Sequence, residues 1–350
     1  MKNFLRQFGG KVTPQLQQRY ARSSRWQDGK FHNYHDVKLD PDWREIPGML
    51  YRQVTDTGGR RPEQPLPILP FDKDAFLAPG EKGKFVWYGH SALLLRLAGK
   101  TVLLDPMLGP DTTPIVPSSN RRFSAGTLEL VDDFPPIDLV LLTHDHYDHL
   151  DYASIQRLLG RVGAYYVALG VGRHLERWGV DPALITEFDW YESHQLDELA
   201  ITFTPTQHFS GRGLSDRMQT LWGGWLLATP TEKIWFSGDG GYNEHFREIG
   251  EKLGPFDLAF MECGQYNDDW RPVHLFPDEA VRAATDAGVR KAIPVHWGGF
   301  NLSYQHTWRE PAAEFIAAAR AAGLAYALPR LGQIFTVDDK LLTPWWEAYP

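Results

Sequence analysis

Short apolar runs separated by polar turns dominate the chain from residue 85 onwards, and they predict an alternation of strands and helices. The stretch 85–106, FVWYGHSALLLRLAGKTVLLDP, indicates two or three strands with a hairpin turn at Ala98–Lys100. A loop rich in Pro and Ser follows over Pro106–Ser124. Further runs predict strands at 137–143, 165–169 and 199–208, with helices around 154–161 and 174–178.

The second half of the chain repeats this rhythm of strands followed by helices and strands in alternation. Two successive blocks of this kind predict two sheets with helices on their outer faces. The strands are expected at 221–228, 233–237, 256–263, 291–298 and 333–337, and the helices at 243–253, 277–288 and 311–323.

The first 80 residues lack this periodicity. The segment 56–70, DTGGRRPEQPLPILP, carries too much Gly and Pro for long helices or strands. We therefore expect residues 1–80 to form an irregular arm packed on the main body. Residues 81–350 are expected to form a single domain.

Composition narrows the function classes. A formal net charge of −8 argues against a general nucleic-acid binder and against simple electrostatic attraction to anionic lipid. The single cysteine, Cys263, cannot form an internal disulfide. The start MKNFLRQFGGKVTPQ is too polar for a signal peptide, and no apolar run approaches the ~18 residues of a spanning helix. These features predict a cytoplasmic protein.

The stretch LVLLTHDHYDHLD, residues 139–151, places a cluster of His and Asp directly after an apolar strand. Such side chains bury poorly unless something satisfies them. Residues two apart in extended backbone point the same way, so His144 and His146 can bind one ion together. Asp148 and His149, at the turn that follows, can face a second ion. A solvated, His-rich turn is the alternative, and the complete H-x-H-x-D-H pattern favours divalent metal.

Two ions need more ligands than these four, and three further candidates follow apolar strands. They are His208 in TPTQHFSGRG, Asp239 in IWFSGDGGY and His296 in AIPVHWGGF. Each alone is typical of a strand cap or a turn. Their shared position at strand exits supports a common metal site.

At these residues the chain resembles the metallo-β-lactamase superfamily, over roughly Phe85–Val337. The resemblance implies a four-layer αββα sandwich with a dinuclear metal site along one edge of the sheets. The expected cofactors are two divalent ions, with zinc as the first choice and iron or manganese as alternatives. The resemblance also implies that His144, His146 and His208 bind one ion and that Asp148, His149 and His296 bind the other. Asp239 is expected to bridge the two ions.

A narrower resemblance is to the N-acylphosphatidylethanolamine-hydrolysing phospholipase D enzymes. It rests on YGHSALLL, LLDPMLG, PPIDLVLLTHDHYDHLD, FTPTQH, LWGGW, GDGGY, IGEKLGPFDLA, PDEAV and HWGGF in this order. IGEKLGPFDLA lies away from the expected ligands, so shared metal binding does not explain it. Asp145 departs from the Asn that those enzymes tend to carry. The resemblance implies that hydroxide held between two metals attacks the phosphorus of the lipid, which yields phosphatidic acid and an N-acylethanolamine.

Further candidates surround the expected metals. Asp105 is placed to accept a hydrogen bond from a metal-bound histidine, with a plain strand cap as the alternative. His90 and His274 match family positions. The alternative for His90 is a hydrogen-bonded core histidine, and the alternative for His274 is a surface residue at the start of a helix. We predict catalytic roles for Asp148, Asp239 and His274. Of these, His274 could orient a phosphate or protonate a leaving group. Acyl chains are expected to contact some of Trp222, Trp225, Trp270, Trp297 and Phe300, and His174, His194, His245 and His306 are expected at the surface or in caps.

Two other functions remain open. The same site could hydrolyse a lactone, a cyclic nucleotide or another soluble phosphodiester, and a non-catalytic binding protein is the third interpretation. A lipid substrate requires contact with a bilayer, so we predict an exposed apolar patch on the arm or on the Pro106–Ser124 loop for peripheral membrane contact. The sequence does not specify the oligomeric state.

Overall fold

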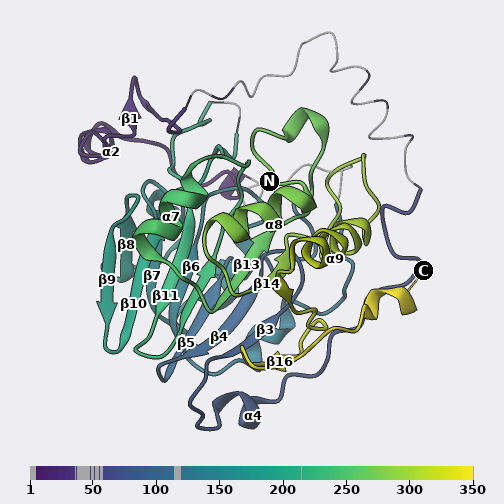
Figure 1. Cartoon of the computed structure of the whole chain (residues 1–350). Coiled ribbons are helices and arrows are strands. Elements are labelled where there is room, and N and C mark those ends of the chain that lie inside the picture. Colours follow the sequence, from purple (N-terminus) through teal and green to yellow (C-terminus); the bar gives the residue numbers. More distant parts are fainter. Residues whose placement is uncertain are drawn as a thin grey trace.

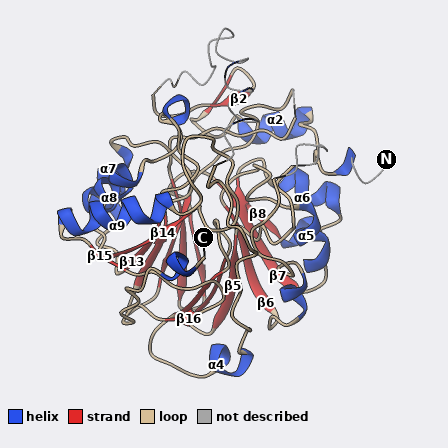
Figure 2. Cartoon of the chain, turned by 90° about the vertical axis from the view of Figure 1, so that its right-hand side faces the viewer, coloured by secondary structure: helices blue, strands red, loops and turns tan. Residues whose placement is uncertain are grey.

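Two facing sheets with helices on their outer faces make up the body of the molecule (Figure 1 and Figure 2). The structure is a computed structural model. The predicted four-layer αββα sandwich is thereby confirmed. The described residues are 5–35, 37, 48, 51, 55, 58–113, 120–213 and 215–349.

The first sheet starts as an antiparallel meander and continues with parallel strands. Its hairpin turns at Ala98 and Gly99, whose φ angles of 46° and 72° suit the twist of a two-residue turn. This is the turn predicted from the sequence. Within the described residues the strand order is β16 (Ile334–Phe335), β3 (Lys84–Trp87), β4 (Leu93–Leu97), β5 (Lys100–Leu104), β6 (Ile137–Leu142), β7 (Val162–Ala168) and β8 (Ile185–Phe188).

The second sheet has the same design, with antiparallel strands on one side and parallel strands on the other. Three strands of the two sheets, β8, β9 and β15, were not predicted. β9 is largely exposed and β15 has two residues, so neither carries an apolar run. In the described chain the order is β15 (Ala325–Tyr326), β14 (Lys291–Val295), β13 (Leu258–Glu262), β12 (Lys233–Phe236), β11 (Gly224–Ala228), β10 (Leu199–Thr204) and β9 (Ser193–Leu196).

Helices cover the outer face of each sheet, as Figure 2 shows for α5 and α6 on one side and α7, α8 and α9 on the other. Among the described residues, no helix combines the length and hydropathy that a membrane span requires. The α-helices of the body are α5 (Tyr152–Leu158), α6 (Gly172–Trp178), α7 (His245–Leu253), α8 (Pro277–Asp286) and α9 (Glu310–Ala322), and the 3₁₀ turns are Glu129–Asp132, Pro182–Leu184, Asp268–Trp270 and Trp345–Ala348.

Aromatic side chains join the two sheets in the core. Phe85 of β3 lies 5.8 Å from Phe260 of β13 between ring centroids, and Phe188 of β8 lies 5.3 Å from Trp225 of β11. All four side chains are buried. These contacts hold the sheets face to face. The loops that follow β5, β6, β10, β12 and β14 meet at one edge of the sandwich.

The N-terminal arm contributes short elements and several anchors. Tyr20 and Phe31 are fully buried and pack together with Trp26. Most of residues 36–57 lies outside the described residues, so the predicted boundary at residue 80 stays a prediction. The elements of this part are α2 (Pro14–Tyr20), β1 (Trp26–Gln27), β2 (Lys30–Phe31) and α4 (Lys73–Leu77).

Candidate metal centre

The structure brings all seven predicted metal ligands together at the edge where the strand-end loops meet. They form overlapping groups of ligand atoms that lie within 4.8 Å of one another. The loop after β6 supplies His144, His146, Asp148 and His149, while the segments after β10, β12 and β14 supply His208, Asp239 and His296.

Three imidazoles make up the first group. His144 Nε2 lies 2.9 Å from His146 Nδ1, and His208 Nε2 lies 3.2 Å from the same atom. On its other side, the His208 ring donates a hydrogen bond from Nδ1 to Val273 O at 2.9 Å. With its hydrogen on Nδ1, a neutral His208 carries a lone pair on Nε2, directed at the group.

The same reasoning assigns the tautomer of His144. Its Nδ1 lies 2.9 Å from Thr143 Oγ1, and this hydroxyl donates to Asp105 Oδ2 at 2.6 Å. Because the hydroxyl hydrogen is used, Thr143 accepts a hydrogen from His144 Nδ1, and His144 Nε2 has a lone pair facing inward. Burial and the neighbouring imidazoles keep the pKa of His144 well below its usual value, so the ring is neutral.

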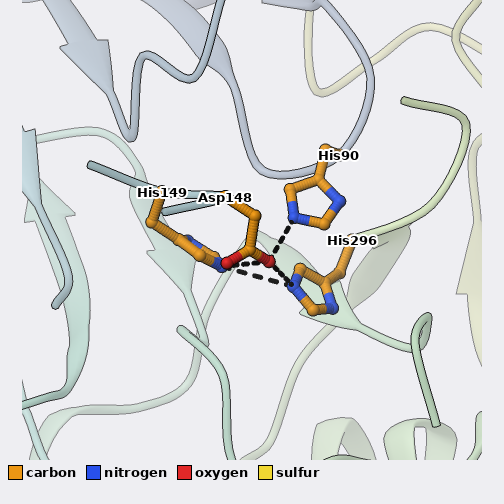
Figure 3. Close-up of side chains that lie close together, drawn as sticks. All are labelled: His90, Asp148, His149 and His296. Carbon is orange, nitrogen blue, oxygen red and sulfur yellow. Dashed lines mark hydrogen bonds and ion pairs between the residues drawn. The ribbon is translucent and has the colours of Figure 1, made fainter. Parts of the chain in front are cut away.

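The second group surrounds Asp148 (Figure 3). Its Oδ2 lies 2.9 Å from His90 Nε2, 3.4 Å from His296 Nε2 and 3.6 Å from His149 Nε2. The outer nitrogens of two of these rings are occupied. His149 Nδ1 donates to Asp105 Oδ2 at 2.8 Å, and His296 Nδ1 donates to Gly264 O at 3.2 Å. The inner Nε2 atoms of these rings therefore face the carboxylates.

Asp239 lies between the two groups. Its Oδ2 is 2.9 Å from His149 Nε2, 3.0 Å from His296 Nε2 and 4.0 Å from His144 Nε2. Its buried Oδ1 has no hydrogen-bond partner among the described residues. The turn needs glycine at Gly238, where φ is 67° and a Cβ would lie 2.3 Å from Gly223 O. This turn places the carboxylate within reach of both groups.

Several site residues hold a backbone conformation that is costly for them. His90, Asp105 and His296 have φ angles of 56°, 38° and 68°. Two backbone hydrogen bonds hold His90 and His296 in this geometry, from His90 N to Trp297 O at 2.6 Å and from His296 N to His90 O at 3.0 Å. Strain of this kind concentrates at functional sites, where the surroundings maintain it.

The charges and donor atoms of the site fit a cation. Burial alone would lower the pKa of both His149 and His296. The carboxylates of Asp239 and Asp148 outweigh burial, raising the pKa of His149 well above its usual value and that of His296 to about 10. Inward lone pairs and carboxylate oxygens repel one another unless protons or metal ions lie between them. Imidazole and carboxylate donors with occupied outer nitrogens fit a divalent metal.

One buried acid next to the centre was not predicted. Glu262, the last residue of β13, accepts from Gly240 N at 2.7 Å and is paired with His274 Nδ1, and it lies 3.6 Å from His296 Nδ1. The signal was available, because Glu262 ends an apolar strand in the same way as Asp105. This pairing holds the His274 ring beside the candidate ligands.

The structure excludes a surface position for three other histidines. His174, His245 and His306 are buried rather than at the surface, while His194 is exposed as expected. His174 Nε2 lies 3.3 Å from Asp145 Oδ2, and the other oxygen of this carboxylate accepts from Gly211 N at 2.8 Å. Asp145, the residue that departs from the family pattern, is thus a buried and hydrogen-bonded member of the ligand loop.

A cavity of about 160 Å³ opens onto the candidate ligands. It is smaller than the 300–1,000 Å³ that is usual for ligand pockets. No arginine belongs to its lining in the described part of the chain. The lining residues are His146, Asp148, Phe209, Asp239, Gln265, Trp270, His274, His296 and Leu302.

Of the five aromatic residues considered as substrate contacts, Trp270 lines the cavity, and the other four are buried and absent from its described lining. Trp222 is fully buried and donates from Nε1 to Thr206 O at 3.2 Å, away from the cavity. Phe300 is buried behind His90, with its ring edge-on to the imidazole and below the guanidinium of Arg122. Both are therefore packing residues. Trp270 lines the cavity, and its substrate contact stays a prediction.

Comparison with known sequences identifies the family. Residues 100–297, more than half of the chain, match the family model described as the beta-lactamase superfamily domain. The chain belongs to the metallo-β-lactamase superfamily. An uncharacterised protein of Mycobacterium tuberculosis is 37% identical over 335 residues, which covers 93% of this chain and 87% of that protein. The N-acyl-phosphatidylethanolamine-hydrolyzing phospholipase D 1 of Caenorhabditis elegans is 33% identical over 259 residues, covering 70% and 72% of the two chains.

Solved structures show the same fold. An isothiocyanate hydrolase from Delia radicum gut bacteria superimposes with a TM-score of 0.57 at 21% identity, covering 72% of this chain and 98% of that one. CmlA, a diiron β-hydroxylase from Streptomyces venezuelae, gives 0.55 at 20% identity, covering 74% and 55%. At these identities the likeness concerns the fold alone. The chain is a metallo-hydrolase of this superfamily that resembles N-acylphosphatidylethanolamine-hydrolysing phospholipase D.

Proposed function

We propose that this chain is a dinuclear metal-dependent phosphodiesterase of phospholipase D type. The substrate is an N-acylphosphatidylethanolamine, and the products are phosphatidic acid and an N-acylethanolamine. The observation that carries the proposal is the convergence of seven ligand side chains, with Asp239 within reach of both groups. The 33% identity with the Caenorhabditis elegans phospholipase extends over 70% of this chain and supports the lipid substrate.

Each group of side chains would hold one divalent ion, for which zinc is proposed first and iron or manganese are alternatives. When bound, two such ions make a water molecule nucleophilic at neutral pH and neutralise charge on the phosphoryl oxygens. Asp239 is proposed as the shared ligand. The first ion is assigned to His144, His146 and His208, and the second to Asp148, His149 and His296.

The cavity suits the polar part of a lipid. Its volume of about 160 Å³ can admit a phosphodiester group while the acyl chains stay outside. Phe209, Trp270 and Leu302 line it together with the candidate ligands, so apolar surface is available where chains would leave the centre. A lining without arginine among the described residues favours a lipid over a nucleotide.

His274 is proposed to protonate the leaving group. In the reaction, water adds to phosphorus, the bond from phosphorus to the ethanolamine oxygen breaks, and that oxygen takes up a proton. His274 lines the cavity, and Glu262 accepts from its Nδ1, which leaves Nε2 to act on the substrate.

Replacement of this side chain separates a catalytic role from a metal-binding role. We expect His274→Gln to lower kcat about 100-fold, because general acid catalysis by a placed side chain is worth about this factor or more. KM and metal content should change little. Steady-state kinetics and elemental analysis check this, with the exposed His194→Gln as the matched control. Loss of metal from His274→Gln, or an unchanged kcat, contradicts the role.

A substrate panel tests the proposed function. Purified protein is incubated with N-acylphosphatidylethanolamine, bis(p-nitrophenyl) phosphate and a lactone, in parallel with His146→Ala. We expect phosphatidic acid and N-acylethanolamine from the wild type, measured by mass spectrometry, and neither product from the variant. Turnover of the lactone without turnover of any phosphodiester overturns the proposal.

The small cavity also favours a second candidate function, the hydrolysis of a soluble phosphodiester or lactone. This alternative predicts efficient turnover of the small substrates and none of the lipid. The third interpretation, a non-catalytic binding protein, predicts no bound metal and no activity after metal addition.

The proposed lipid substrate requires peripheral contact with a bilayer. Large apolar side chains are exposed at Leu5, Tyr34, Tyr51 and Leu342 among the described residues. Residues 114–119 of the loop and most of residues 36–57 of the arm lie outside the described residues. The predicted apolar patch therefore stays a prediction.

A further inference from the structure

The N-terminal arm reaches the candidate metal centre at Asn33. The Asn33 side chain donates from Nδ2 to His208 O at 2.8 Å, and its Oδ1 accepts from His208 N at 3.1 Å. One amide therefore binds both backbone polar groups of a candidate metal ligand that lies 175 residues further along the chain. A pair of hydrogen bonds of this kind restrains the backbone of His208 on both sides of its Cα atom.

Trp222 sets the direction of the Asn33 amide. The indole of Trp222 donates from Nε1 to Asn33 Oδ1 at 3.0 Å. An indole can only donate, so the amide oxygen of Asn33 must face Trp222 and its nitrogen is left for the carbonyl of His208. Since Trp222 is fully buried, this orientation is built into the core. Trp222 thus has a place in the site, behind the ligand rather than against the substrate.

The arm is fixed two residues before Asn33. Phe31 is fully buried, and its N–H donates to Met218 O at 2.7 Å. The Phe31 ring packs on Tyr20 and Trp26, at 5.6 Å and 4.8 Å between centroids. Asn33 therefore follows an anchored residue, and it is not carried by a free chain end.

A second part of the arm holds the loop that carries four of the other candidate ligands. Arg212 donates to Gln7 O at 2.9 Å, and the same guanidinium donates to Asp145 O at 2.7 Å and to Leu150 O at 2.8 Å. Gly10 N donates to Nδ1 of His174, the partner of Asp145, at 3.1 Å. The arm is thereby tied to both ends of the segment 145–150, which contains three of the candidate ligands.

The ring of His208 and its backbone are held by different partners. Val273 O accepts from Nδ1 and aims Nε2 at His146, whereas the backbone N–H and C=O have Asn33 as their partner in the described part of the chain. We propose that Asn33 is a positioning residue for His208, so that the arm completes the metal centre within the same chain. This inference rests on the proposed function, because it takes His208 to be a metal ligand.

The test is the metal affinity of Asn33→Ala. Zn²⁺ is titrated into metal-free protein against a competing chelator, and Co²⁺ is used for absorption spectra of the site. Replacing a residue that orients a ligand costs roughly 10- to 100-fold in metal affinity. We expect a loss of this size for the metal equivalent assigned to His144, His146 and His208, together with an altered Co²⁺ spectrum. The equivalent assigned to Asp148, His149 and His296 should change little in affinity.

His32→Ala is the matched control, because the described hydrogen bond of the His32 side chain is to Gln27 O of the arm and not to a candidate ligand. It should bind both equivalents like the wild type. If Asn33→Ala fails to fold, Asn33→Asp gives the same readout. The aspartate keeps the acceptor for Trp222 but cannot donate to His208 O, so the same selective loss is expected.

The outcomes separate this inference from the proposed function. Wild-type affinity for both equivalents in the Asn33 variants overturns the positioning role and leaves the phosphodiesterase proposal standing. An equal loss of affinity for both metal equivalents also overturns the positioning role, because a loosened arm would affect the whole site. A wild-type protein that binds no metal overturns both.

Discussion

Asp239→Ala is expected to lower kcat/KM for phosphodiester hydrolysis by at least about 10³-fold. Asp239 Oδ2 is the atom that approaches His149, His296 and His144, so its removal takes the proposed shared ligand from both groups. Metal ions contribute several kcal/mol of transition-state stabilisation, and about 4 kcal/mol corresponds to this factor. Kinetics and elemental analysis should show the loss of activity together with a loss of bound metal.

A surface carboxylate provides the control for this prediction. Asp197 forms an ion pair with Lys100, and 71% of its side chain is exposed. Asp197→Ala should leave kcat/KM and metal content unchanged, because an exposed pair of this kind contributes little. If Asp239→Ala kept two metal equivalents and the wild-type rate, Asp239 would not be the shared ligand.

Much of the fold could be predicted because its strands are buried on both faces. β6, Ile137–Leu142, is apolar at nearly every position, and the turn at Ala98 and Gly99 has the composition of a hairpin. β8 and β9 lie at sheet edges, where the packing that stabilises a strand comes from one side. The hydrophobic pattern of the sequence is weaker in such edge strands, so β8 and β9 were not predicted.

The candidate ligands could be grouped from sequence because each follows an apolar strand, and the ends of neighbouring strands meet at one sheet edge. The contact of Asn33 could not be predicted in this way. It lies in an irregular arm, and its partner His208 is 175 residues away, so the pairing depends on how the arm packs. Trp222 failed as a substrate contact for a related reason. Its type suits a pocket wall or a core equally, and only the packing decides between them.

Removing bound metal with a chelator is expected to lower the free energy of unfolding by about 4 kcal/mol, the contribution of a ligand present at a thousand times its Kd. Without metal, the buried carboxylates of Asp148 and Asp239 depend on protonated His149 and His296 for their charge balance. Urea unfolding of metal-loaded and chelated protein measures the difference, and added Zn²⁺ should restore it. Asp239→Ala, already short of metal, should respond less. An unshifted midpoint in the wild type would mean that no metal occupies the centre, because a bound ion must favour the folded state that assembles its ligands.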